Sequence, residues 1–125
     1  MANVKVYSRK VDGNKKASKD FYLSEYACKD GSDYFKFDAD LYPIIQRFRD
    51  YVEAPVQISS AYRNESWNKK QGGANGSYHV KGQAADIPYL SSFKNLKDPY
   101  RMAAFFKTLK VPSIIVYSWR SAYWY

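Results

Sequence analysis

The stretch from Ser77 to Ile87 reads SYHVKGQAADI and contains His79, the single histidine of the chain. Asp86 follows seven residues later, with one glycine and two alanines between them. A neutral imidazole and a carboxylate both bind divalent metals, and catalytic zinc usually takes three protein ligands and one water. The small residues would let the backbone turn closely between two ligands. This spacing also arises by chance, so it leaves a metal site and a hydrogen-bonded structural histidine both open.

The composition predicts one folded domain. A chain of 125 residues can bury a core without disulfides, and 46% hydrophobic residues without low-complexity segments are typical of folded proteins. We see no internal repeat and no linker. We therefore expect a single domain over residues 1–125, with a basic N-terminal segment at 1–20 and the core at 21–125. The 13 tyrosines can pack as half-buried wedges or line a groove for a polar polymer.

The net charge of +8 favours an anionic environment, such as nucleic acid, an acidic membrane or a cell-wall polymer, without choosing among them. Apart from Lys15, Lys16 and Lys19, the basic residues are scattered, as on a solvated surface. No apolar run is long enough to span a bilayer, and the first 20 residues lack the apolar centre of a secretory signal. We expect synthesis in the cytoplasm without a signal peptide.

The lone cysteine, Cys28, cannot form an internal disulfide. The segment YACKDG follows the apolar Leu23, which favours a small packed residue over a nucleophile at Cys28. A cysteine protease that pairs Cys28 with His79 is a poor alternative.

Hydrophobic periodicity predicts alternating helices and short strands. Apolar residues at helical spacing predict a helix after Asp38 or Asp40, with Pro43 in its first turn. Asp98 and Pro99 predict the start of another helix. We expect further elements at 4–6 (strand), 54–62 (strand), 65–70 (helix), 84–87 (strand) and 113–117 (strand). This pattern predicts an α+β domain with a small, mostly antiparallel sheet and flanking helices.

Several spaced motifs occur together around the histidine. They are Ser60-Ala61-Tyr62-Arg63, Asn68, Gly72-Gly73, and then Ser77, His79, Gly82, Ala84 and Asp86. This pattern resembles the zinc D-alanyl-D-alanine carboxypeptidase family, which cuts peptidoglycan peptides and shares its fold with the Hedgehog signalling domain. Upstream, FYLSEYACKDG and LYPIIQRFRDYVEAPVQI are also similar to that family, so the resemblance covers roughly residues 21–117. It implies a Hedgehog/DD-peptidase-like fold.

The resemblance implies a zinc site and a role for one arginine. His79 and Asp86 would bind Zn²⁺, which polarises the scissile carbonyl and activates water. Arg63, as the catalytic residue, would present its fork of donors to the substrate carboxylate or to the developing oxyanion. The alternative for Arg63 is a structural ion pair with a nearby acid.

Three neighbours of these residues are candidates for substrate binding. Ser77 is better suited to a backbone hydrogen bond in the turn than to nucleophilic attack, since no second base can activate it. Tyr62 and Tyr78 would either line the substrate groove or pack against the rest of the domain.

The family pattern also includes a second histidine on a strand near the C-terminus, and this sequence contains none. One explanation is that the sequence ends just before the segment with the third ligand. The other is that the protein is complete at Tyr125 and has lost catalysis. A site with only two ligands would hold zinc weakly.

We therefore expect a zinc-dependent peptidoglycan peptidase, of the carboxypeptidase or endopeptidase type, that acts on stem peptides if a third ligand is supplied. The resemblance and the missing signal suggest a phage or prophage protein that reaches the cell wall after phage-mediated release or within the virion. An inactive wall-binding or virion structural module with the same fold is the alternative. The hypothesis that the protein binds nucleic acid rests on charge alone, and we do not expect nucleic acid as a partner. The oligomeric state stays open.

Overall fold

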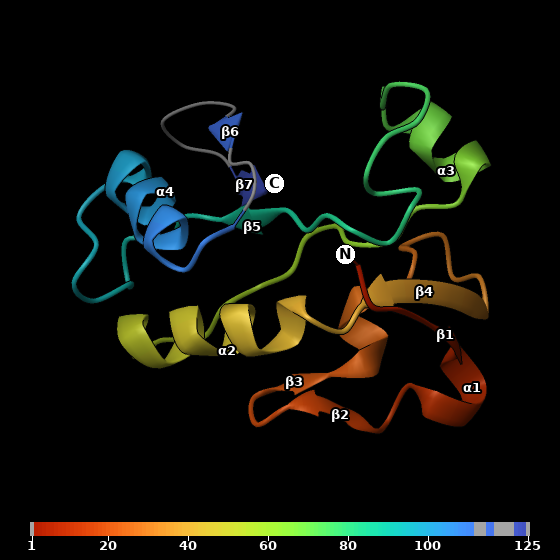
Figure 1. Cartoon of the computed structure of the whole chain (residues 1–125), viewed down its shortest axis with the longest axis horizontal. Helices are drawn as coiled ribbons and strands as arrows, with labels where there is room; N and C mark the ends of the chain where they lie inside the picture. The colour runs from red at the N-terminus through yellow and green to blue at the C-terminus, as the bar shows by residue number, and fades with distance from the viewer. Residues whose placement is uncertain (1, 112–114, 117–121, 125) are drawn as a thin grey trace.

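The computed structural model describes residues 2–111, 115–116 and 122–124. Within these ranges the chain is an α+β protein, as predicted from the sequence (Figure 1). The elements in chain order are β1 (Val4–Ser8), α1 (Arg9–Asp12), β2 (Lys16–Ser18), β3 (Phe21–Tyr22), the 3₁₀ helix η1 (Leu23–Tyr26), β4 (Tyr34–Asp38), α2 (Leu41–Val52), α3 (Glu65–Lys70), β5 (Ile87–Pro88), α4 (Pro99–Thr108), β6 (Ile115–Val116) and β7 (Ala122–Trp124). None of the helices in these ranges is both long and apolar enough to cross a lipid bilayer.

The strands of the described residues form three small antiparallel sheets rather than one. β1 pairs with β4, β2 pairs with β3, and β7 lies between β5 and β6. The strand predicted at 54–62 is wrong, because among the residues that the structure describes this segment makes only an isolated bridge, between Ser60 and Asp86. The strand predicted at 113–117 is present at 115–116, and its other residues lie outside the described ranges.

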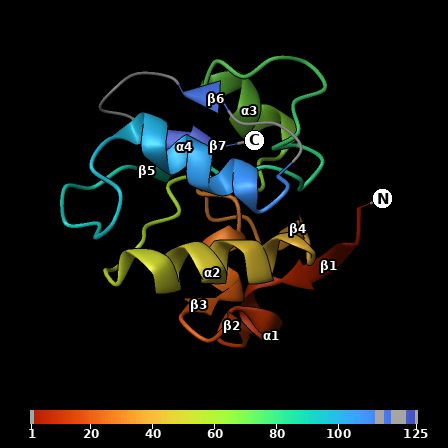
Figure 2. The ribbon, with the colours of Figure 1, turned by 60° about the vertical axis from the view of Figure 1, so that its left-hand side comes forward.

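The core lies between α2 and the elements on its two sides. The buried face of α2 consists of Leu41, Tyr42, Ile45, Phe48 and Val52, which confirms the predicted amphipathic helix. Phe48 stacks on Phe106 of α4, with ring centroids 4.6 Å apart, and α4 lies beside α2 (Figure 2). Burial of these aromatic rings stabilises the domain, since each removes a large apolar area from water.

Local signals at the helix starts explain where α2 and α4 begin. The Asp98 side chain accepts a hydrogen bond from the backbone N–H of Arg101, and Pro99 occupies the first turn of α4, as predicted. Asp40 precedes α2 but makes no capping hydrogen bond. Asp38 instead accepts the N–H groups of Asn3 and Asp40, both at 3.0 Å, and so ties the N-terminal segment to the start of α2.

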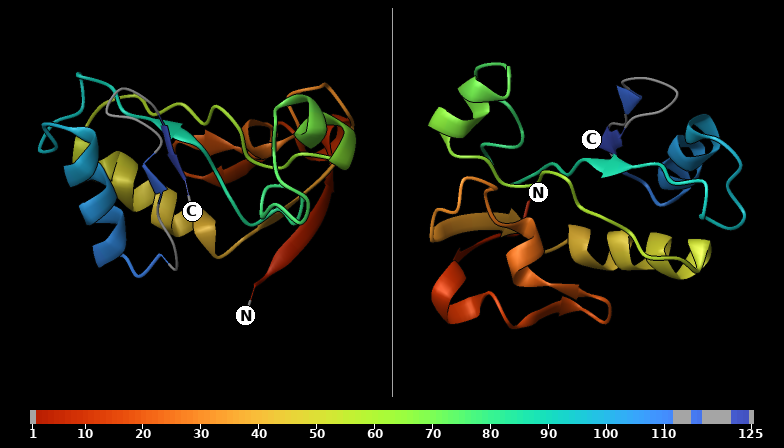
Figure 3. Two further views of the ribbon diagram at one scale, coloured as in Figure 1. Left: turned by 90° about the horizontal axis from the view of Figure 1, so that it is seen from above. Right: turned by 180° about the vertical axis from the view of Figure 1, so that it is seen from behind.

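The histidine-containing loop lies directly on β4. Gly82 accepts a hydrogen bond from the N–H of Asp38 at 2.8 Å. Gly82 has a φ of +72°, and a Cβ atom there would lie 2.6 Å from the carbonyl oxygen of Lys36. Only glycine fits this left-handed, close backbone contact. α3 and this loop lie at the opposite end of the molecule from α4 (Figure 3).

We expect Gly82→Ala to destabilise the fold more than Gly76→Ala. Both glycines have a φ of +72°, but nothing lies within 4 Å of a Cβ atom at Gly76. Both variants should lose about 1–2 kcal/mol of unfolding free energy from the left-handed backbone. The Gly82 variant should lose a further 1–3 kcal/mol or so, because the new methyl group overlaps β4. Urea unfolding followed by circular dichroism measures the difference, and equal losses would contradict the close contact.

Candidate metal centre

Backbone hydrogen bonds join the two segments that carry the candidate site. The N–H of Asp86 donates to the carbonyl oxygen of Ser60 at 2.7 Å, and the N–H of Ser59 donates to the carbonyl oxygen of Asp86 at 3.0 Å. Three residues beyond this bridge, the N–H of Arg63 donates to the carbonyl oxygen of His79 at 3.1 Å. The side chains of Arg63, His79 and Asp86 therefore lie together.

The hydrogen bonds of His79 determine which ring nitrogen carries a hydrogen. His79 is only 3% exposed, and its Nδ1 lies 2.7 Å from the carbonyl oxygen of Ala61. A carbonyl oxygen can only accept, so Nδ1 carries the hydrogen. In the neutral ring Nε2 then presents a lone pair to Oδ1 of Asp86, which lies 3.1 Å away. Two acceptors at this distance repel each other unless a proton or a metal cation lies between them.

These two atoms fit the first two positions of a zinc site. Zinc bonds of about 2.0–2.1 Å in a tetrahedral arrangement place two ligand atoms about 3.3 Å apart. The 3.1 Å between Nε2 of His79 and Oδ1 of Asp86 is close to that distance. The carbonyl of Ala61 orients the ring, as hydrogen-bond partners of metal-binding histidines usually do. Within the described ranges, no group of three or more His, Cys, Asp and Glu side chains could hold a metal.

Arg63 binds the second oxygen of the same carboxylate. Its Nη2 donates to Oδ2 of Asp86 at 3.3 Å, its Nε to Oγ of Ser60 at 2.9 Å, and its Nη1 to Oδ1 of Asn68 at 3.2 Å. These contacts use three of the five N–H donors of a guanidinium group. Asp86 therefore has one oxygen directed at Arg63 and the other at His79. Within the described residues, the other two N–H groups of Arg63 make no hydrogen bond.

Asn68 links α3 to this arginine. It is 4% exposed, accepts from Arg63 and donates from Nδ2 to the carbonyl oxygen of Ala74 at 3.0 Å. A Cβ atom at Gly73 would lie 2.1 Å from Oδ1 of Asn68, so a side chain there would displace the amide that contacts Arg63 and the carbonyl of Ala74. The sequence pattern contained Asn68 and both glycines, but their link to Arg63 depends on the path of the loop.

The predicted substrate-binding residues do not share one surface. Tyr62 is 6% exposed and packs edge-on against Tyr34, with centroids 5.8 Å apart, and its burial raises the pKa of its hydroxyl. Tyr78 is 58% exposed, and Nζ of Lys81 lies 4.8 Å from the centroid of its ring. Oγ of Ser77 accepts the N–H of His79 at 3.2 Å, which fits a role in the turn.

Cys28 is fully buried, in agreement with its interpretation as a packed residue. Burial raises the pKa of its thiol and so disfavours the reactive thiolate.

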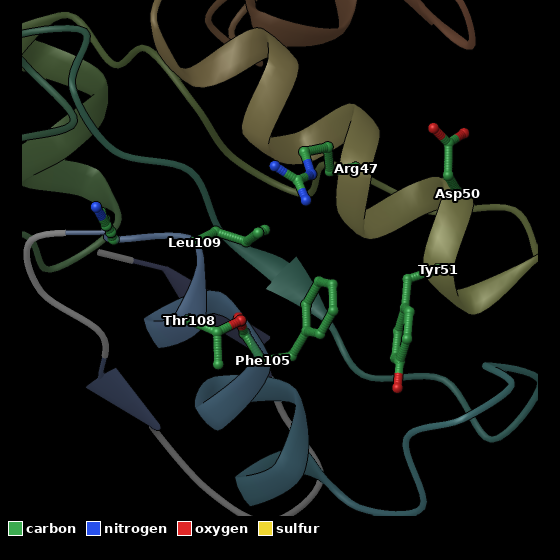
Figure 4. A pocket seen from close by; sticks show the side chains of 7 residues that line it. Arg47, Asp50, Tyr51, Phe105, Thr108 and Leu109 are labelled. Carbon is green, nitrogen blue, oxygen red and sulfur yellow. The ribbon is translucent and has the colours of Figure 1, made fainter.

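A hollow is lined by residues of α2 and by residues at the end of α4 (Figure 4). It has a volume of about 570 Å³, and Tyr51 and Phe105 stack there with centroids 4.3 Å apart. Arg47 and Asp50 project from α2 at its rim. Its lining includes none of Arg63, His79 and Asp86.

Comparison with known proteins identifies one family. Residues 16–114, most of the chain, match the family model described as Peptidase M15. No significant match was found among curated proteins or among solved structures.

We expect Asp86→Asn and Asp86→Ala to differ in stability. The asparagine amide can donate to Nε2 of His79 while its oxygen still accepts from Arg63. The Asn variant should therefore unfold within about 1 kcal/mol of the native protein. Alanine leaves partly buried donors of Arg63 without their acceptor and should cost about 2–3 kcal/mol. Urea unfolding with a chelator present measures both, and equal losses would contradict the assigned hydrogen on Nδ1.

Proposed function

The chain belongs to the peptidase M15 family, and from this premise we propose that it is a zinc-dependent peptidase that hydrolyses the stem peptides of peptidoglycan. The observation that carries the zinc proposal is the 3.1 Å contact between Nε2 of His79 and Oδ1 of Asp86. Both atoms are acceptors when the ring is neutral, so a divalent cation is a suitable partner for the pair. The Hedgehog/DD-peptidase type of fold is part of the same proposal.

His79 and Asp86 would hold the zinc ion. Bound zinc supplies a Lewis acid that polarises a carbonyl and activates water at neutral pH. The carbonyl of Ala61 holds the hydrogen on Nδ1 and keeps Nε2 directed at the ion position.

Arg63 would act both on the metal ligand and on the substrate. Its contact with Oδ2 of Asp86 orients the carboxylate. Its two further N–H groups can bind a terminal carboxylate or stabilise the negative charge that develops on the attacked carbonyl. A fixed guanidinium beside a metal ligand suits both the carboxypeptidase and the endopeptidase type of cleavage.

The cell wall is the proposed place of action. The net charge of +8 favours association with anionic wall polymers. We propose a phage or prophage protein that meets its substrate after release from the host cytoplasm or as part of a virion.

A second candidate function is a wall-binding or virion structural module without catalysis. One observation favours it: within the described residues, His79 and Asp86 are not joined by a third His, Cys, Asp or Glu that could bind the same metal. Catalytic zinc usually has three protein ligands. A module of this kind would keep the fold and bind peptidoglycan without cutting it.

We expect the purified full chain with zinc to release D-alanine from a synthetic stem pentapeptide or to cut a cross-linked muropeptide. Removing a hydrogen-bond partner of a metal ligand typically lowers activity by roughly 10–100-fold. His79→Ala and Asp86→Asn alter the metal ligands themselves, so each should lower the rate by more than that. Asp50→Asn is the matched control, because it makes the same chemical change on α2 and should leave the rate unchanged. Chromatographic product analysis measures the rates.

The same preparations separate the two candidates. Cosedimentation with isolated cell walls without any product would favour the binding module. Hydrolysis that survives both site variants would disprove the assigned metal ligands, and the absence of both hydrolysis and cosedimentation would disprove both functions.

A further inference from the structure

A second hollow lies between α3 and the loop of residues 75–81. It has a volume of about 790 Å³. Ser66 and Lys69 line it from α3, and Asn75, Ser77 and Lys81 line it from the loop. α3 and the loop that follows it face each other at one end of the molecule (Figures 1 and 3).

Two residues connect this hollow to the candidate metal centre. Asn68 lines the hollow and accepts a hydrogen bond from Nη1 of Arg63. Ser77 also lines it and accepts the N–H of His79. The hollow therefore adjoins the residues that hold the arginine and the imidazole, and a peptide bound at the metal centre can extend into it.

The lining of the hollow is mostly polar, and its charged side chains are more basic than acidic. Lys69 lines it from α3 and Lys81 from the loop, while Glu65 is the single acidic side chain among the described lining residues. Among the described residues, no acidic side chain forms an ion pair with either lysine. Val80 is the one aliphatic side chain of the lining, and the rest are amides, hydroxyls and glycine. Such a surface suits carboxylates and peptide groups better than an apolar side chain.

We propose that this hollow is a substrate subsite that binds a carboxylate-bearing segment of the peptide, with Lys69 and Lys81 as its cationic contacts. The proposal rests on the proposed peptidase function and specifies the substrate class: an anionic peptide with a free carboxylate outside the bond that is cut. The lining residues that the structure describes include no aromatic ring on which a base could stack, and Tyr78, whose ring centroid lies 4.8 Å from Nζ of Lys81, is not among them. A peptide therefore fits this lining better than nucleic acid.

The test uses the full chain with zinc and two probes. One probe is a synthetic stem pentapeptide with free side carboxylates, and the other is the same peptide with those carboxylates amidated. Isothermal titration calorimetry measures affinity, and product release is followed in parallel. Lys69→Gln/Lys81→Gln is the test variant. Lys70→Gln/Lys97→Gln is the matched control, because it also removes two positive charges, from exposed positions outside the hollow.

We expect the test variant to bind the free-carboxylate peptide about fivefold more weakly, the size expected from two exposed ion pairs. The loss should shrink at high salt, since salt screens exposed charges. The control variant should bind as the native chain does. Both variants should bind the amidated peptide as tightly as the native chain binds the amidated peptide.

Other outcomes separate this proposal from the proposed function. Hydrolysis by the native chain with unchanged affinity in the test variant would overturn the subsite and leave the peptidase function standing. A lysine-dependent affinity without any hydrolysis would support the subsite and count against the peptidase. Equal losses in both double variants, or an equal loss with the amidated peptide, would overturn the subsite. A single-stranded oligonucleotide that binds more tightly than the peptide and depends on the same two lysines would also overturn it.

Discussion

The pair of backbone hydrogen bonds between residues 59–60 and Asp86 is the constraint on which the site depends. Successive side chains of an extended segment point to opposite faces, so a shift of one residue in this pairing would direct the carboxylate of Asp86 away from His79. The same pairing places Arg63 beside the carbonyl of His79. One short bridge therefore sets the positions of the imidazole, the carboxylate and the guanidinium together. A site built this way needs little regular sheet around it.

The charges of the site are balanced through Asp86. A buried carboxylate is costly unless it is paired, and here one oxygen contacts Arg63 while the other faces His79. Because the carbonyl of Ala61 accepts from Nδ1, a neutral His79 cannot turn its single donor toward Asp86 without losing that hydrogen bond. A doubly protonated ring can donate to both acceptors, and a neutral ring leaves a lone pair facing the carboxylate.

Much of the helical structure could be predicted because its signals are local. The apolar face of α2, the short α3 before Gly72 and the Asp98-Pro99 start of α4 all depend on residues within a turn or two. The strands were harder to predict, because pairing decides whether an extended segment becomes a strand. Residues 54–62 are extended but almost unpaired. β4 was missed although Phe35 and Phe37 alternate with polar residues and are fully buried.

The sequence pattern also drew attention to His79, Asp86 and Arg63, which the structure brings together. It could not show how they interact. The choice of ring nitrogen depends on a carbonyl from another segment, and the link from Asn68 to Arg63 depends on the space that Gly73 leaves. Tyr62 and Tyr78 look alike in the sequence, but the first is buried and the second is exposed. Burial of a single aromatic residue in a loop has no periodic signal.

The contact between Gly82 and β4 has a consequence for how this protein can diversify. It fixes the backbone at Gly82, while the side chains of Tyr78 and Lys81 in the same loop are exposed to solvent. Substitutions at Tyr78 or Lys81 alter what the solvent-facing side of the loop offers, while the imidazole keeps its place. The loop can therefore acquire new ligand preferences through single surface mutations, a property useful to natural selection and to protein engineers alike.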